Sequence, residues 1–196
     1  MKYIKEFEKL NIQDVVDLIT HYGVTRLRTL IDFEKDINKI YIFKPDKTHN
    51  SNILILACKF RNFFLIKELI KCGADLNMVD GEGDTALIKI LKAYRSEIYT
   101  LKIVNLLVDA GADLNAQDRI GNTPLILSHD LDIRYILIDA GADWNKKNRD
   151  GEDFLDILNK FDNFETIDKI IKKYPKQYKN YLYVKELEKY TDKYNL

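Results

Sequence analysis

The sequence has few of the residues that build disulfides, metal sites or flexible linkers. It contains only 2 Cys, 3 His and 3 Pro in 196 residues. Cys58 and Cys72 do not form a Cys-x-x-Cys motif and lie in apolar helical stretches, so we expect buried free thiols in a reducing compartment. His21, His49 and His129 have no second ligand at a metal-binding spacing. We therefore expect no metal and no cofactor.

The sequence also lacks a charge excess and a long apolar run. Lys+Arg and Asp+Glu both number 31, so the formal net charge is zero and a strongly basic nucleic-acid surface is not indicated. No apolar run approaches the roughly 18 residues of a membrane span, and the N-terminus lacks the apolar core of a signal peptide. We expect no membrane span and a cytoplasmic location, or delivery into a host cell by a route that the sequence does not show.

Motifs that carry catalytic chemistry are missing as well. The sequence has no Walker loop, no Gly-x-Gly-x-x-Gly after a strand, no His-Glu-x-x-His and no Gly-x-Ser-x-Gly. We expect neither enzymatic activity nor a small-molecule substrate. An enzyme subunit whose site is completed by a partner is a second class, and the missing motifs argue against it.

What the sequence does contain is an internal repeat. The pentapeptide Gly-Ala-Asp-Leu-Asn occurs at 73–77 and 111–115, and Gly-Ala-Asp-Trp-Asn occurs at 141–145. Apolar residues at helical spacing precede each Gly, and Gly readily adopts the left-handed conformation that ends a helix. Successive signatures begin 38 and 30 residues apart. The pattern predicts helical repeat units of unequal length.

Each repeat unit also has a predicted helix start. Asn52, Thr85, Thr123 and Asp153 stand at N-cap positions, and Pro124 takes the first helical position, where its missing N–H is not needed. Apolar spacing predicts helices at 53–58, 64–70, 87–91, 103–108 and 167–171.

The order of these motifs resembles the ankyrin repeat. Asp-Arg-Ile-Gly-Asn-Thr-Pro-Leu at 118–125, with the signature at 141–145, carries the resemblance most fully, and it covers roughly 47–175. The resemblance implies an all-α solenoid of about four helix–turn–helix units with β-hairpin-like fingers and helical caps. The expected divisions are an N-terminal helical cap at 1–46 with an extended piece at 40–43, repeats at 47–79, 80–117, 118–147 and 148–175, and a C-terminal capping helix at 176–196.

Departures from the family pattern carry further predictions. Ile88, Ile126 and Asp156 stand where the family has His after Thr-Pro-Leu, which removes a hydrogen bond between adjacent fingers, while Ile adds apolar packing. The extra length of the second repeat falls at 94–100, and the shortage of the third falls around 128–130. Both are expected to be turns between helices, where a length change leaves the apolar faces in register.

The Asp and Asn residues of the signature invite comparison with a calcium loop. Asp75, Asn77 and Asp80 have suitable oxygens, but the required Gly is one place late and no Glu closes a twelve-residue loop. We expect these side chains to accept hydrogen bonds from backbone N–H groups in the turn before the finger. The signature is then scaffold, and function belongs to the residues between the signatures.

The leading functional prediction is a non-enzymatic module that binds a protein. In a stack that resembles ankyrin repeats, finger tips and inner-helix ends line a concave face, and charge beside aromatic residues suits a protein partner. Trp144 has two interpretations that the sequence leaves open, a packed side chain or an exposed anchor. The expected partner-binding residues are His49, Phe60, Glu82, Asp84, Tyr94, Arg95, Arg119, Ile120, His129, Trp144, Arg149 and Phe161.

The sequence does not name the partner. Within the interaction class, the protein could be a bacterial immunity protein that blocks a toxin, or a microbial or viral effector that binds a host protein. Nucleic-acid binding through the Lys- and Tyr-rich C-terminal helix is a third hypothesis, against which Glu186, Glu188 and Asp192 argue. We expect the Tyr residues of that helix to cover the last repeat instead.

Overall fold

The computed structural model describes residues 41–42, 50–93, 98–161 and 164–194. The chain forms two compact halves, Met1–Asp113 and Leu114–Leu196, which we describe in turn. The helix predicted for the N-terminal cap lies outside the described residues. Tyr41–Ile42 (β1) pairs antiparallel with Asn50–Ser51 (β2), which agrees with the extended piece predicted at 40–43.

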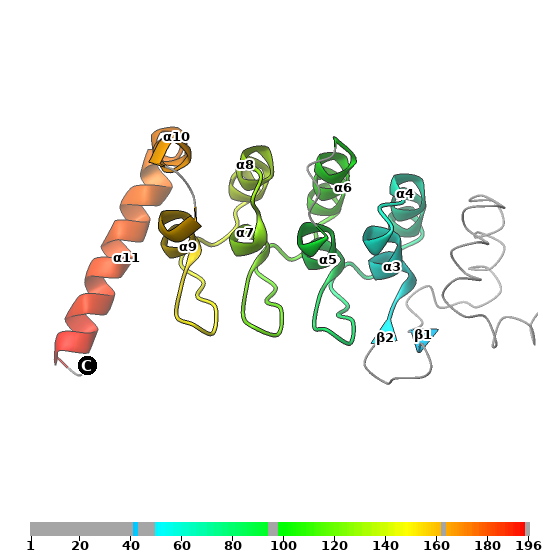
Figure 1. The fold of residues 1–196 in the computed structure, drawn as a ribbon, viewed down its shortest axis with the longest axis horizontal. Helices are drawn as coiled ribbons and strands as arrows, with labels where there is room; N and C mark the ends of the chain where they lie inside the picture. Colours follow the sequence, from blue (N-terminus) through cyan, green and yellow to red (C-terminus); the bar gives the residue numbers. More distant parts are fainter. Residues whose placement is uncertain (1–40, 43–49, 94–97, 162–163, 195–196) are drawn as a thin grey trace, which may run out of the picture. The chain divides into compact units, whose positions relative to one another are not determined.

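The N-terminal half contains two helix pairs, coloured cyan to green in Figure 1. The predicted caps are confirmed, because Asn52 Oδ1 accepts from the Ile55 N–H at 2.8 Å and Thr85 Oγ1 accepts from the Ile88 N–H at 3.3 Å. The first helices of the pairs pack together, α3 against α5, and so do the second helices, α4 against α6. The helices are α3 (Ile53–Lys59), α4 (Phe63–Lys71), α5 (Ala86–Lys92) and α6 (Ile98–Asp109).

The C-terminal half continues the pattern with two helix pairs and one long helix (Figure 1). Thr123 and Pro124 occupy the N-cap and first helical positions as predicted. Asp153 Oδ1 accepts from the N–H groups of Leu155 and Asp156, both at 3.1 Å, which confirms it as a cap. The helices are α7 (Pro124–Leu127), α8 (Leu131–Asp139), α9 (Phe154–Phe161), α10 (Phe164–Lys173) and α11 (Pro175–Tyr194).

The signature glycines end helices in the predicted way. After α4, Gly73 has φ +82°, the Ala74 N–H donates to Leu69 O, and the Gly73 N–H donates to Ile70 O, both at 3.0 Å. This is the Schellman arrangement, which satisfies carbonyls left unpaired at a helix end. Ala74 is buried, as are the alanines at the same place in the other two signatures, Ala112 and Ala142. The Ala of each signature is therefore the apolar contact that accompanies the glycine stop.

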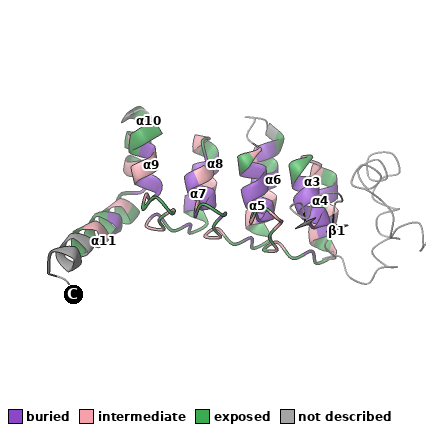
Figure 2. Ribbon diagram, turned by 60° about the horizontal axis from the view of Figure 1, so that its bottom comes forward, coloured by how far each residue is buried: buried purple, intermediate pink, exposed green. Residues whose placement is uncertain are grey.

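Apolar side chains between the helix pairs form the core of each half. Figure 2 shows the buried residues on the facing sides of the helices. Leu54, Leu87 and Leu107 are fully or almost fully buried in the N-terminal half, as are Leu125 and Leu137 in the C-terminal half. Cys58 is also fully buried, and burial raises the pKa of its thiol, which agrees with an inert structural cysteine.

The extra length of the second repeat and the shortage of the third are accommodated in different ways. The prediction of a turn over all of 94–100 was wrong at its C-terminal end, because α6 begins at Ile98 and buries Thr100 in line with Ile103 and Leu107. The extra residues thus lengthen the helix by continuing its apolar spacing. In the third repeat the turn between α7 and α8 is short. Ser128 is the C-cap of α7 and Asp130 is the N-cap of α8, so only His129 lies between them.

The short turn of the third repeat depends on a buried arginine. Arg134, on α8, is 2 % exposed, and its Nε donates to the Ser128 carbonyl at 2.9 Å. Ser128 Oγ donates to the Leu125 carbonyl at 2.7 Å. Arg134 thus satisfies the Ser128 carbonyl at the end of α7, and the Ser128 hydroxyl is a second donor to the Leu125 carbonyl, which also accepts from the Ser128 N–H at 3.3 Å.

Replacing Leu125 by Ala should lower the free energy of unfolding by roughly 2–5 kcal/mol, because it leaves a cavity at a fully buried position. Ile120→Ala is the matched control, since this side chain is 59 % exposed and its loss should cost less than about 0.5 kcal/mol. Urea unfolding followed by circular dichroism measures both. Equal effects of the two substitutions would show that the burial pattern is wrong.

Candidate functional site

The Asp and Asn side chains of the signatures bind backbone N–H groups, as predicted. Asp75 Oδ1 accepts from the Asn77 N–H, and Asn77 Oδ1 accepts from the N–H of Asp113 in the next signature, each at 2.9 Å. In the C-terminal half, Asn115 Oδ1 accepts from the Asp143 N–H at 2.9 Å. The Asn of one signature therefore bonds to the Asp position of the following one. These oxygens are structural hydrogen-bond acceptors.

Each finger is a tight turn organised by its first side chain. Asp118 Oδ1 accepts from the N–H groups of Ile120 at 3.0 Å and Asn122 at 2.9 Å, and the Asp118 N–H donates to the Asn122 carbonyl at 3.1 Å. Asp80 and Asn148 make the equivalent side-chain bonds in their own fingers. We call these turns finger 2 (80–84), finger 3 (118–122) and finger 4 (148–152).

Fingers 3 and 4 are joined to each other by several hydrogen bonds. The Arg149 N–H donates to the Ile120 carbonyl at 3.0 Å, and Gln117 Nε2 donates to the Lys147 carbonyl at 2.8 Å. Gly121 allows this approach, because a Cβ there would lie 2.8 Å from the Arg149 nitrogen and its φ is +82°. The expected loss of a histidine-mediated brace is thus compensated by other bonds. Ile126, which takes the histidine position in the third repeat, is buried as predicted.

Finger 2 contains a buried ammonium group among carboxylates. Lys89 Nζ lies 2.6 Å from Asp80, 2.7 Å from Glu82 and 2.9 Å from Asp84. Burial alone would lower the pKa of Lys89, but hydrogen bonds to the three carboxylates outweigh it and raise the pKa above its usual value. Lys92 adds a second ion pair to Asp84 at 2.7 Å.

This cluster would otherwise be the best cation site in the described part of the chain. Carboxylate oxygens of Asp80, Glu82 and Asp84 lie within 4.8 Å of one another. The ammonium of Lys89 occupies the position between them. Asp84 was expected to face a partner, and that expectation was wrong because its side chain is 0 % exposed and is neutralised by two lysines. Glu82, by contrast, is exposed.

Apart from Asp84 and Trp144, which are buried, the residues expected at a partner-binding surface fall into two groups. His49, Tyr94 and Arg95 lie outside the described residues. Among the others, Phe60 is 49 %, Ile120 59 % and Phe161 71 % exposed, and the polar members Glu82, Arg119, His129 and Arg149 are exposed as well. Their role in binding stays a prediction.

The comparison with known families agrees with the motifs. Residues 54–148 match the family model described as ankyrin repeats, with three copies. This part of the chain consists of ankyrin repeats. No curated protein matches the chain. Ankyrin repeats are in general protein–protein interaction modules and typically have no enzymatic activity. None of the described helices is both long and apolar enough to cross a bilayer.

Trp144, in the last of the three ankyrin signatures, is packed rather than exposed. It is 4 % exposed and makes edge-on ring contacts with Phe154 at 5.7 Å and Tyr174 at 6.2 Å between ring centroids. Of the two interpretations that the sequence left open, the structure favours the packed side chain. Trp144 thus packs between Phe154 at the start of α9 and Tyr174 at the junction of α10 and α11, and it does not belong to the expected surface.

The fourth predicted repeat links finger 4 to the end of α9. Lys160 Nζ lies 2.6 Å from Glu152 of finger 4 and 5.8 Å from the centre of the Phe161 ring. The hydrogen bond from Lys160 lowers the pKa of Glu152. The exposed Phe161 ring therefore sits beside a charged pair, which is the combination expected at a protein-binding surface.

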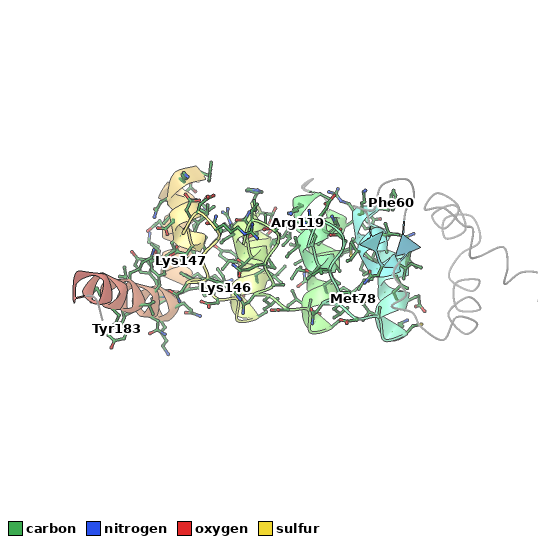
Figure 3. All side chains as sticks on the ribbon, turned by 90° about the horizontal axis from the view of Figure 1, so that it is seen from below. Phe60, Met78, Arg119, Lys146, Lys147 and Tyr183 are labelled. Carbon is green, nitrogen blue, oxygen red and sulfur yellow. The ribbon has the colours of Figure 1, made fainter. Side chains whose placement is uncertain are left out.

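Sequence reasoning missed several residues that the structure leaves partly or fully exposed, Lys146 partly and Lys147 and Phe64 fully. Lys146 and Lys147 follow the third signature directly, and Figure 3 shows them with Arg119 on the finger side of the C-terminal half. Phe64 is also missed and is 71 % exposed. The signal that could have found the lysines is their position between a scaffold turn and a finger, where no helix packs.

Replacing Lys89 by Met should lower the free energy of unfolding by about 3 kcal/mol, because it leaves buried carboxylates without their shared cation. Lys92→Met is the matched control. Its side chain is 34 % exposed and Asp84 keeps Lys89, so we expect a loss of less than about 1 kcal/mol. Urea unfolding at neutral pH measures both. A Lys89→Met variant as stable as the unchanged protein would contradict the role given to this cluster.

Proposed function

We propose that this protein is a non-enzymatic interaction module that binds another protein through its fingers and inner-helix ends. The observation that supports this most directly is the exposure of large apolar side chains at these places, namely Phe60, Ile120 and Phe161. A repeat stack does not need these side chains for its own core. Each lies near charged residues, and apolar contacts framed by charge are typical of specific protein interfaces.

The rigidity of the fingers supports the same proposal. Ile120 stands in finger 3, whose backbone is fixed by Asp118 and bonded to finger 4 through Arg149. A surface held in this way loses little conformational entropy when a partner binds. The same bonds leave the side chains at the tips free to differ from one ankyrin protein to another. Binding specificity would then come from tip residues on a common scaffold.

The charges near the exposed side chains set the chemistry of the partner. At finger 2 the three carboxylates outnumber Lys89 and Lys92, which leaves negative charge there. Arg119 and Arg149 instead bring positive charge to fingers 3 and 4. A partner with apolar groups and charges of both signs would match these surfaces and be steered to them. A toxin bound by an immunity protein and a host protein bound by an effector both fit this description. An adjacent toxin gene would favour the former and a secretion locus the latter.

The proposal is tested by capture of the partner from the native cell, followed by mass spectrometry and a direct affinity measurement. Changing Phe60 and Phe161 together to Ala should weaken binding of the captured protein at least tenfold, since truncating an interface anchor commonly costs more than about 1.4 kcal/mol. The thermal unfolding midpoint should stay nearly unchanged because both side chains are exposed.

Lys67→Ala on α4 is the matched control, because it removes an exposed side chain away from the fingers and inner-helix ends. It should leave the affinity unchanged. Full retention of affinity in the Phe60/Phe161 double variant would contradict the proposed surface. A large loss of stability in that variant would show that the rings belong to the core.

A further inference from the structure

The C-terminal helix α11 has one side that is fixed to the fourth repeat. Tyr181 on this side and Tyr174, directly before the helix, are both buried. Lys185 Nζ lies 2.7 Å from Asp153 and 3.1 Å from Asp156, at the start of α9. This side therefore acts as the cap expected from the sequence, with two tyrosines covering apolar surface and a lysine pairing the carboxylates beneath it.

The opposite side of α11 carries exposed apolar side chains among exposed polar ones. Leu182 is 45 % and Tyr183 63 % exposed, and Leu187 on the adjoining flank is 47 % exposed. Figure 2 shows exposed residues along this helix, and Figure 3 shows Tyr183 projecting from it. Three large apolar side chains exposed within six residues form a candidate contact surface for another chain.

Two charged residues frame this apolar face in a particular order. Lys179, Leu182, Tyr183 and Glu186 follow one another at spacings of three, one and three residues, which places them on one face of the helix. All four are exposed. The positive charge lies before the apolar pair and the negative charge the same distance after it. The face is therefore its own complement when it is turned by 180° about an axis through its centre.

We propose that the occupant of this face is a second copy of the chain, with two α11 helices packed antiparallel. In that arrangement Lys179 of each copy lies opposite Glu186 of the other, and the Leu182 and Tyr183 side chains pack around the two-fold axis. A two-fold interface requires this kind of self-complementary patch. A parallel pairing would place like charges side by side. The proposal uses α11 alone and does not depend on the proposed binding by fingers and inner-helix ends.

The interface is small, and this sets the strength of the association. One helix face per copy buries less than the roughly 1,200 Å² of a stable complex, so the dimer is a weak one. It should therefore be measured by sedimentation equilibrium over a range from about 10 µM to about 1 mM. We expect the apparent mass of the unchanged protein to rise over this range. A protein that stays monomeric up to about 1 mM would overturn the proposal.

Charge reversal separates this arrangement from unspecific association of apolar surface. Lys179→Glu gives each helix two acidic residues on this face and Glu186→Lys gives two basic ones, so each variant alone should associate roughly tenfold more weakly or worse. Mixing the two variants should restore association as a heterodimer. The double variant Lys179→Glu/Glu186→Lys should also associate, because its charge order is reversed but still self-complementary.

Lys67→Glu on α4 is the control for net charge, because it changes the total charge as Lys179→Glu does but at an exposed site on another helix. It should associate like the unchanged protein. The proposal is wrong if the single reversals associate normally, or if mixing them restores nothing. Circular dichroism of each variant confirms that α11 is still helical, since only solvent-facing residues are changed.

Discussion

The hydrogen bond from one signature to the next is the interaction on which the repeat structure depends. A chain that leaves a helix at Gly73 must satisfy its backbone N–H groups without a helix or a sheet, and the Asp and Asn side chains of the signature do this. Because Asn77 reaches the backbone of the following signature, each turn is fixed to its neighbour. The fingers start from these turns, so their positions follow from the same bonds.

The local features of the fold could be predicted from the sequence because their causes are local. A cap such as Thr85 or Asp153 acts on N–H groups two or three residues away, and a glycine stop acts on the turn that precedes it. The start of α6 was missed because the added residues have apolar spacing of their own. Helix starts were placed too late by more than one residue in two cases: α6, where an insertion continues the helix, and α10, which begins at Phe164 and not at 167.

The candidate surface was predictable only in part, because exposure is set by contacts distant in sequence. Phe60 and Phe161 are exposed as expected, and both stand at the ends of their helices. Asp84 and Trp144 are buried by partners that spacing alone does not reveal, a lysine from the following helix in one case and the rings of Phe154 and Tyr174 in the other. A polar or aromatic residue in a finger or signature can thus be buried within the fold or exposed at the surface. The residues that pack against it in the folded chain determine which.

The lysine enclosed by finger 2 has a consequence for how this region responds to its surroundings. Loops built from clustered carboxylates usually change shape when calcium or magnesium enters or leaves, since the ion is exchangeable. Here the cation is Lys89 on α5, which is attached to the chain and lies between the three carboxylates. Finger 2 therefore needs no exchangeable ion to neutralise these carboxylates.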